Sequence, residues 1–249
     1  MLDSFKRWIA GGPDGPAWRD VADWARQRGA GFKRAHDDEG FVVDAALDAR
    51  PWRLEWGPPQ RGYIEGHELR LRIELGLSQN LQMLLLSRPL FETLERQTFE
   101  TYTATTQTHI DVSTPEEMRW LAMYPKVPLA DRDLRNHFGA VAWSPTSAAA
   151  WLDGPVSQRL AEARLGALRD DPALVLMTLR GRVYLRLQLA APEVATLEAM
   201  AVLFETAAVQ AVHVAGARAR DAATVWPSTA STAWQTQLLP DEGEGRSRN

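Results

Sequence analysis

The sequence predicts an α+β fold in which helices pack on one face of antiparallel sheet segments. Three observations predict it: residues 174–189 alternate in the manner of a tight β-hairpin, residues 63–86 alternate in the same manner, and a helical segment follows each stretch. Antiparallel sheets commonly have one buried face and one wet face, and this produces the alternation of apolar and polar side chains. Helices are then needed to cover the apolar face.

The hairpin at residues 174–189 is the clearest element. Arg180-Gly181 supplies its turn, because glycine tolerates positive φ. Before the turn, both alternating sets of side chains are largely apolar. After the turn, one face carries Val183, Leu185, Leu187 and Leu189, and the other carries Arg182, Tyr184, Arg186 and Gln188.

The first half of the chain is predicted to contain a helix, several strands and a second helix. Trp18, Val21 and Trp24 form a helical stripe that Gly29 ends. A helix with Pro89 in its first turn closes this half. The predicted segments are a helix in residues 17–30, strands around residues 41–46, 52–56, 69–75 and 81–87, and a helix over residues 90–97.

The second half begins with a Thr-rich stretch, residues 99–112, whose β-branched content favours a strand. Thr114, Pro115 and Glu117 then match a helix start, with Thr114 as the N-cap and Glu117 closing a capping box. Pro125 ends this helix. Further helices are predicted over residues 131–138 and, on either side of Gly154-Pro155, within residues 147–168.

The last predicted helix, residues 193–217, is rich in Ala and Val and is long enough to be weighed as a membrane span. Glu198 and Glu205 lie inside it, and a charge at such depth costs about 2.5–3.5 kcal/mol on insertion scales. We therefore expect a buried helix of a soluble domain and no integral membrane segment.

This order of elements divides the chain into four parts. They are an N-terminal amphipathic segment (1–16), a first α+β half (17–98), a second α+β half that ends in the long helix (99–220) and a disordered tail (221–249). The phrases RGYIEGHELRLRIEL and RGRVYLRLQL look alike, which is the basis for two similar halves. Coincidence is the alternative, since antiparallel strands produce Leu-Arg alternation without common ancestry.

The composition excludes several classes of chemistry. The chain has 249 residues, a formal net charge of -4 and no cysteine. Without cysteine there are no disulfides, thiolate nucleophiles or Cys-ligated metals, and a cytoplasmic location is favoured. The net charge gives no general attraction to nucleic acid. Common nucleotide-binding, hydrolase and zinc-protease motifs are absent from the sequence, so we expect no cofactor and no metal.

The N-terminal segment places Leu2, Phe5, Trp8 and Ile9 on one side of a short helix. We expect this helix to pack on its own domain. Peripheral contact with a membrane surface through Phe5, Trp8 and Ile9 is the alternative.

His109 and Asp111 are the candidate catalytic residues. Residues two apart on a strand share a face, so the carboxylate is able to orient the imidazole as a general base. A structural hydrogen bond explains the same pair, and we favour that interpretation.

Arginines on the polar strand faces are the candidate ligand-binding residues: Arg70, Arg72, Arg182 and Arg186, with Arg61 and Arg180 nearby. Where carboxylates such as Glu65, Glu68 and Glu74 neutralise them, the face is merely solvated. Where they do not, the face binds a phosphate or a carboxylate. We expect the neutralised arrangement.

The polar C-terminal tail contains apolar residues that are candidate partner-binding residues: Trp226, Trp234, Leu238 and Leu239. Such anchors dock into grooves, and packing on the parent domain is the alternative. We therefore expect a non-catalytic interaction or adaptor module with a protein partner. The alternative is an enzyme or small-ligand binder of unrecognised type, with a pocket near His109 and Asp111.

Overall fold

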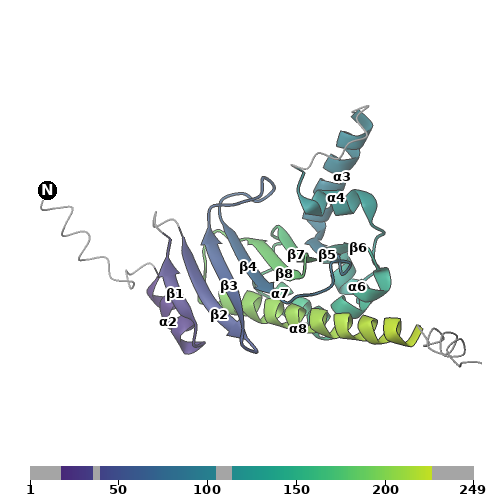
Figure 1. The fold of residues 1–249 in the computed structure, drawn as a ribbon. Helices are drawn as coiled ribbons and strands as arrows, with labels where there is room; N and C mark the ends of the chain where they lie inside the picture. The colour runs from purple at the N-terminus through teal and green to yellow at the C-terminus, as the bar shows by residue number, and fades with distance from the viewer. Residues whose placement is uncertain (1–17, 36–39, 105–113, 226–249) are drawn as a thin grey trace, which may run out of the picture.

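The computed structural model describes residues 18–35, 40–104 and 114–225, which form an eight-stranded antiparallel sheet with packed helices (Figure 1). The predicted α+β fold is confirmed. The strands are β1 (Gly31–Arg34), β2 (Phe41–Leu47), β3 (Arg50–Gly57), β4 (Glu68–Glu74), β5 (Met83–Ser87), β6 (Phe138–Ala142), β7 (Leu174–Leu179) and β8 (Arg182–Gln188). The helices are α2 (Arg19–Gln27), α3 (Arg88–Ala104), α4 (Glu116–Met123), α5 (Arg132–His137), α6 (Pro145–Leu152), α7 (Pro155–Arg164) and α8 (Val194–Val225).

The order of the strands in the sheet is β1-β2-β3-β4-β8-β7-β5-β6. β4 and β5 are consecutive in the chain, but the β7–β8 hairpin lies between them, with β8 paired to β4 and β7 paired to β5. The hairpin turn has positive φ at Arg180 (51°) and at Gly181 (82°), as a type I′ turn requires. The predicted hairpin is therefore confirmed.

The larger hydrophobic core lies between one face of the sheet and the helices α2, α6, α7 and α8. Figure 1 shows α8 running across the strands along this face. Leu197, Met200, Phe204 and Ala208 are fully buried and recur every three or four residues, so they form the side of α8 that contacts the sheet. Among the described residues, α8 is the one helix long and apolar enough to cross a bilayer, a test that the core helix of a soluble protein also passes.

A second, smaller core lies on the opposite face, where α3 and α4 cover β5, β6 and β7. Phe91 and Trp120 pack there with Leu86, Val175 and Met177. The cause is visible in β7, whose alternating side chains are apolar on both faces and need cover on both. Helices thus occupy both faces over β5–β7. Over β2, β3, β4 and β8 this second face has polar side chains, and we call that part the open face.

The predicted strand over residues 99–112 is wrong for its first part, because residues up to Ala104 belong to α3. Helix propagation costs little once the first turns are packed, and here Phe91 and Leu94 hold them on the sheet. The β-branched content of a segment is a weaker influence than this packing. Residues 105–113 lie outside the described residues, and His109 and Asp111 lie there.

Two strands were missing from the sequence-based prediction. β1 has four residues, and β6 follows α5 without any polar residue that would produce an alternating pattern. The helix predicted over residues 131–138 therefore ends at His137, and Phe138 begins β6. At the other end of the chain, α8 continues to Val225, five residues beyond Arg220.

The two predicted halves share a single sheet. Their boundary, residues 98 and 99, falls inside α3, and β5 of the first half lies between β6 and β7 of the second. The two similar phrases are neighbouring antiparallel strands, since β4 pairs with β8 and Arg70 lies opposite Arg186.

Candidate functional site

The open face of the sheet and the connections beside it carry the arginines that the sequence singled out, and each has a carboxylate partner. Arg182 pairs with Glu74, Arg72 lies 3.6 Å from Glu55, and Arg180 lies 3.1 Å from Glu116. These pairs join side chains from different strands and helices. They therefore fix a polar surface in which positive and negative groups alternate.

Glu68 is the buried centre of this face. Its side chain is fully buried, and its two oxygens accept hydrogen bonds from Arg186, from Arg70 (3.4 Å) and from the Gln60 backbone amide (2.7 Å). A buried carboxylate without such partners would cost several kcal/mol. The sequence pattern predicts a strand from residue 69, next to Glu68, but gives no sign that Glu68 would lie under the β3–β4 connection.

Glu117 is a second fully buried carboxylate, at the first turn of α4. Its Oε1 accepts a hydrogen bond from the Tyr63 hydroxyl (2.9 Å) and another from Arg61 Nε (3.2 Å), whereas its Oε2 has no partner. Burial and the charge of Glu117 raise the pKa of Tyr63 far above its usual value, so Tyr63 is a neutral donor. This contact anchors α4 to the connection between β3 and β4.

The predicted capping box is therefore wrong. The N-cap of α4 is Pro115, no side chain caps the helix, and Glu117 bonds to Arg61 and Tyr63 instead of to the backbone. A charge-assisted bond to Arg61 is stronger than a bond to a neutral backbone amide. Glu117 and the buried Trp120 are three residues apart and share a helix face, so the carboxylate lies on the side of α4 that packs on the rest of the molecule.

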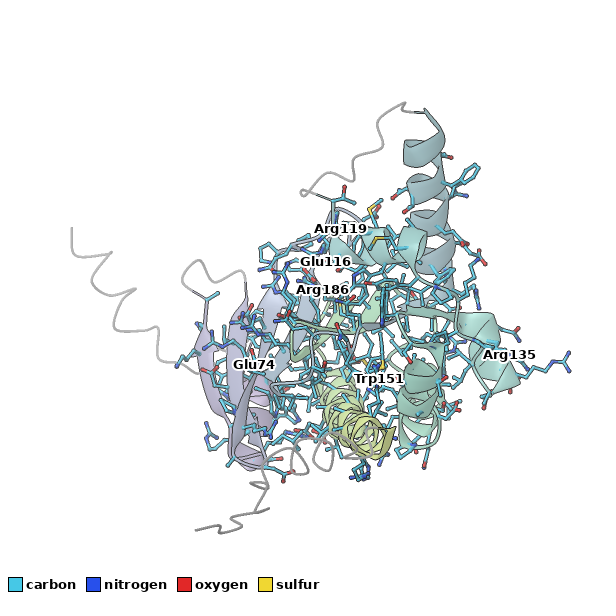
Figure 2. All side chains as sticks on the ribbon, turned by 45° about the vertical axis from the view of Figure 1, so that its right-hand side comes forward. Glu74, Glu116, Arg119, Arg135, Trp151 and Arg186 are labelled. Carbon is cyan, nitrogen blue, oxygen red and sulfur yellow. The ribbon has the colours of Figure 1, made fainter. Side chains whose placement is uncertain are left out.

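Arg119 and Glu116 lie on the same helix and pair at 2.5 Å, while the buried Nε of Arg119 has no partner. Figure 2 labels Glu116 and Arg119 of α4 together with Arg186 of the open face. Because Glu116 also pairs with Arg180 at the β7–β8 turn and Glu117 pairs with Arg61, α4 is tied to the neighbouring elements by a polar junction. Its charged groups are paired with one another, which is chemistry suited to holding elements together.

A second polar cluster joins α5, α7 and the chain that leads into β7. His137 Nδ1 lies 3.1 Å from Asp171 Oδ1, and Arg164 contacts both Asp171 (2.7 Å) and His137 Nε2 (3.2 Å). Because arginine only donates, Nε2 accepts and Nδ1 carries the proton in this arrangement. Both ring nitrogens are therefore engaged, and the imidazole acts as a structural link.

Helix α2 is held against one flank of α8 by Arg28. Its guanidinium lies 2.6 Å from Glu198 and 2.8 Å from Glu205, and Trp24 Nε1 donates to Glu198 at 2.7 Å. Burial opposes the charge of Arg28, but the hydrogen bonds that Arg28 donates to Glu198 and Glu205 outweigh it and raise the pKa of Arg28 above its usual value. Helix α2 therefore covers this flank of α8 as far as Glu205.

Beyond Glu205 the same flank of α8 is open. Val209 and Val212 follow at helical spacing, and their side chains are 48% and 41% exposed. They border a groove of about 360 Å³ that also has Ala208, Leu47 and Leu75 in its wall. We call this the α8 groove. The polar residues in its wall are Asp48, Arg50 and His213.

A second groove, between α6 and the last turns of α8, shares His213 with the α8 groove. It is lined in part by Gln210, Ala217, Arg218 and Arg220. The α8 groove is thus an apolar trough with a polar and mainly basic surround. Sequence reasoning missed it because Leu47, Leu75 and Val209 come from three elements that are far apart in the chain.

Several predicted residues lie outside the described part of the chain and remain predictions: His109, Asp111, Trp226, Trp234, Leu238, Leu239, Phe5, Trp8 and Ile9. Within the described residues, no three His, Asp or Glu side chains are grouped so that they could hold a metal ion. The tryptophans Trp24, Trp52, Trp56, Trp120 and Trp151 are buried, while Trp143 is exposed beside Tyr124.

Comparison with known proteins gives no relative for this chain: no family model, no curated protein and no solved structure matches it.

Proposed function

We propose that this chain is a non-catalytic interaction module that binds an amphipathic, acidic segment of a protein partner in the α8 groove. The observation that carries the proposal is the exposure of Val209 and Val212 on a flank of α8 that is covered elsewhere by α2. Grooves of this type receive the apolar side of a helix or an extended segment. Val209 and Val212 lie on a rigid, packed helix, so the site is preformed.

The charge around the groove supports an acidic partner. Arg50 and His213 lie in the wall, Arg218 lies in the adjoining groove, and Asp48 is the acidic residue in the wall. Acidic side chains that flank apolar anchors would therefore meet mainly basic groups. Electrostatic complementarity of this kind favours the right partner and speeds association.

Peptide selection on the purified chain tests the proposal. A random peptide library displayed on phage is expected to yield peptides with apolar residues three or four positions apart and acidic neighbours. Replacing the two valines (Val209→Glu with Val212→Glu) is expected to weaken their binding at least about tenfold, or ~1.4 kcal/mol. The matched control is Leu165→Glu, an exposed leucine on another surface (77% exposed), which leaves binding unchanged. If the valine substitutions leave the affinity for the selected peptides unchanged, the proposal is contradicted.

A further inference from the structure

The chain continues beyond the end of α8 at Val225 with residues 226–249, which carry the chemistry expected of a ligand for the α8 groove. Residues 226–240 contain no charged side chain. Within them Trp234 and Leu238 are four positions apart and Leu239 follows. Asp241, Glu242 and Glu244 come next. The segment thus has apolar anchors followed by acids.

The segment is long enough to reach the α8 groove. Val212 precedes Val225 by thirteen residues, which corresponds to about 20 Å along the axis of an α-helix. Trp234 follows Val225 by nine residues, and nine extended residues span up to about 30 Å. Trp234 and the residues after it are therefore within reach of Val212 and Val209.

The groove and the segment also match in charge. The wall of the α8 groove contains Arg50 and His213 beside Asp48. The acids after Leu239 would enter this mainly basic surround. Attachment to the same chain provides an effective concentration of roughly millimolar, which makes even weak contacts significant.

We infer that residues 234–244 of the chain occupy its own α8 groove and compete there with a protein partner. This inference rests on the proposed function for the identity of the competitor, but occupancy by the chain's own segment is tested separately. The groove would then be regulated by displacement of the C-terminal segment.

Disulfide mapping in the full chain tests the occupancy directly, because the chain contains no cysteine of its own. The pair Val212→Cys and Leu238→Cys is expected to form a disulfide within one monomer under mild oxidation. The matched control pair joins Leu238→Cys with Leu165→Cys, since Leu165 is exposed on α7's C-terminal side and borders a different groove. Crosslinks between chains would make a second copy the occupant and overturn the inference. Equal crosslinking of both pairs, or none, would also overturn it.

A second measurement separates failure of the inference from failure of the proposed function. In the full chain, Trp234→Ser with Leu238→Ser and Leu239→Ser is expected to raise the affinity for the selected peptides at least tenfold. Unchanged affinity means that the peptides bind but the segment does not compete, which overturns the inference alone. An internal disulfide at Val212, together with a serine variant that binds no peptide, overturns the proposed function alone.

Discussion

The Tyr63 hydroxyl donates a hydrogen bond of 2.9 Å to Oε1 of the fully buried Glu117. This bond, with the nearby Arg61, links α4 to the β3–β4 connection across the border between the open face and the smaller core. The carboxylate is out of water, so its stability depends on these donors.

Removing the hydroxyl with Tyr63→Phe is expected to lower the free energy of unfolding by about 1–3 kcal/mol. The reason is that a buried charged acceptor loses one of its two donors. The measurement is urea denaturation followed by tryptophan fluorescence. Tyr184→Phe is the matched control, because its hydroxyl accepts only a long contact of 3.4 Å from Arg182 on the open face. Equal losses in the two variants would show that the Glu117 contact has no special role.

Because Glu198 is hydrogen-bonded to Arg28 and Trp24, we expect the free energy of unfolding to change with pH in the acid range. Burial alone would raise the pKa of Glu198, but hydrogen bonds from Trp24 and Arg28 lower it below its usual value. A carboxyl whose folded-state pKa is depressed stabilises the fold above its unfolded pKa, near 4.3, and loses this contribution as the pH falls. We expect the wild-type stability to decline below about pH 4.3 more steeply than that of Glu198→Gln. Chemical denaturation at a series of pH values measures this.

Trp24→Phe provides an intermediate case for the same measurement. It removes one of the two donors that depress the pKa of Glu198 and keeps the Arg28 pair. Its acid slope is expected to lie between those of the wild type and Glu198→Gln. Three parallel slopes would refute the assignment of this pH dependence to Glu198.

Gly139 on β6 permits the close approach of α3. A Cβ at this position would lie 2.5 Å from the ring of Phe91, which packs in the smaller core. Gly139→Ala is expected to cost about 1–3 kcal/mol of stability by overpacking. Gly62→Ala, where a Cβ meets nothing within 4 Å, is expected to stay within about 0.5 kcal/mol. Adding Phe91→Leu to Gly139→Ala should recover part of the loss, since the two changes share one contact.

Val209 and Val212 are predicted to contribute little to folding despite their position on the core helix. Their exposure means that Val209→Ser with Val212→Ser should change the free energy of unfolding by less than about 1 kcal/mol. Phe204→Ala, on the buried side of the same helix, should cost about 3–5 kcal/mol. Thermal and urea unfolding of both variants checks this difference. A large loss of unfolding free energy in the valine variant would mean that Val209 and Val212 contribute to the hydrophobic core.

The strands with alternating side chains were predictable because the pleat of a strand is a local property. β3, β4 and β8 each have apolar residues on one face and polar residues on the other, and the type I′ turn at Arg180-Gly181 has its own local signature. The helices α6 and α7 were predictable for a similar reason, as Gly154-Pro155 separates them.

The features that escaped prediction depend on contacts between distant parts of the chain. α3 continues past residue 99 because its first turns are packed on the sheet, and β6 is a strand because β5 lies beside it. Glu117 does not form the expected capping box because Arg61 and Tyr63, which lie in another part of the chain, bind its carboxylate. The α8 groove lies on the part of α8 that α2 does not cover, and no local sequence pattern indicates where that cover ends.

The insertion of the β7–β8 hairpin between β4 and β5 has a consequence for biosynthesis. During translation β4 and β5 emerge from the ribosome long before residues 174–188 do. Until then, the edges of β4 and β5 that later pair with β8 and β7 have no hydrogen-bonding partner. Such edges invite pairing with other nascent chains. The sheet is therefore complete only after its central strands β7 and β8 have been synthesised. A chain truncated before these strands would expose both edges and be prone to aggregation.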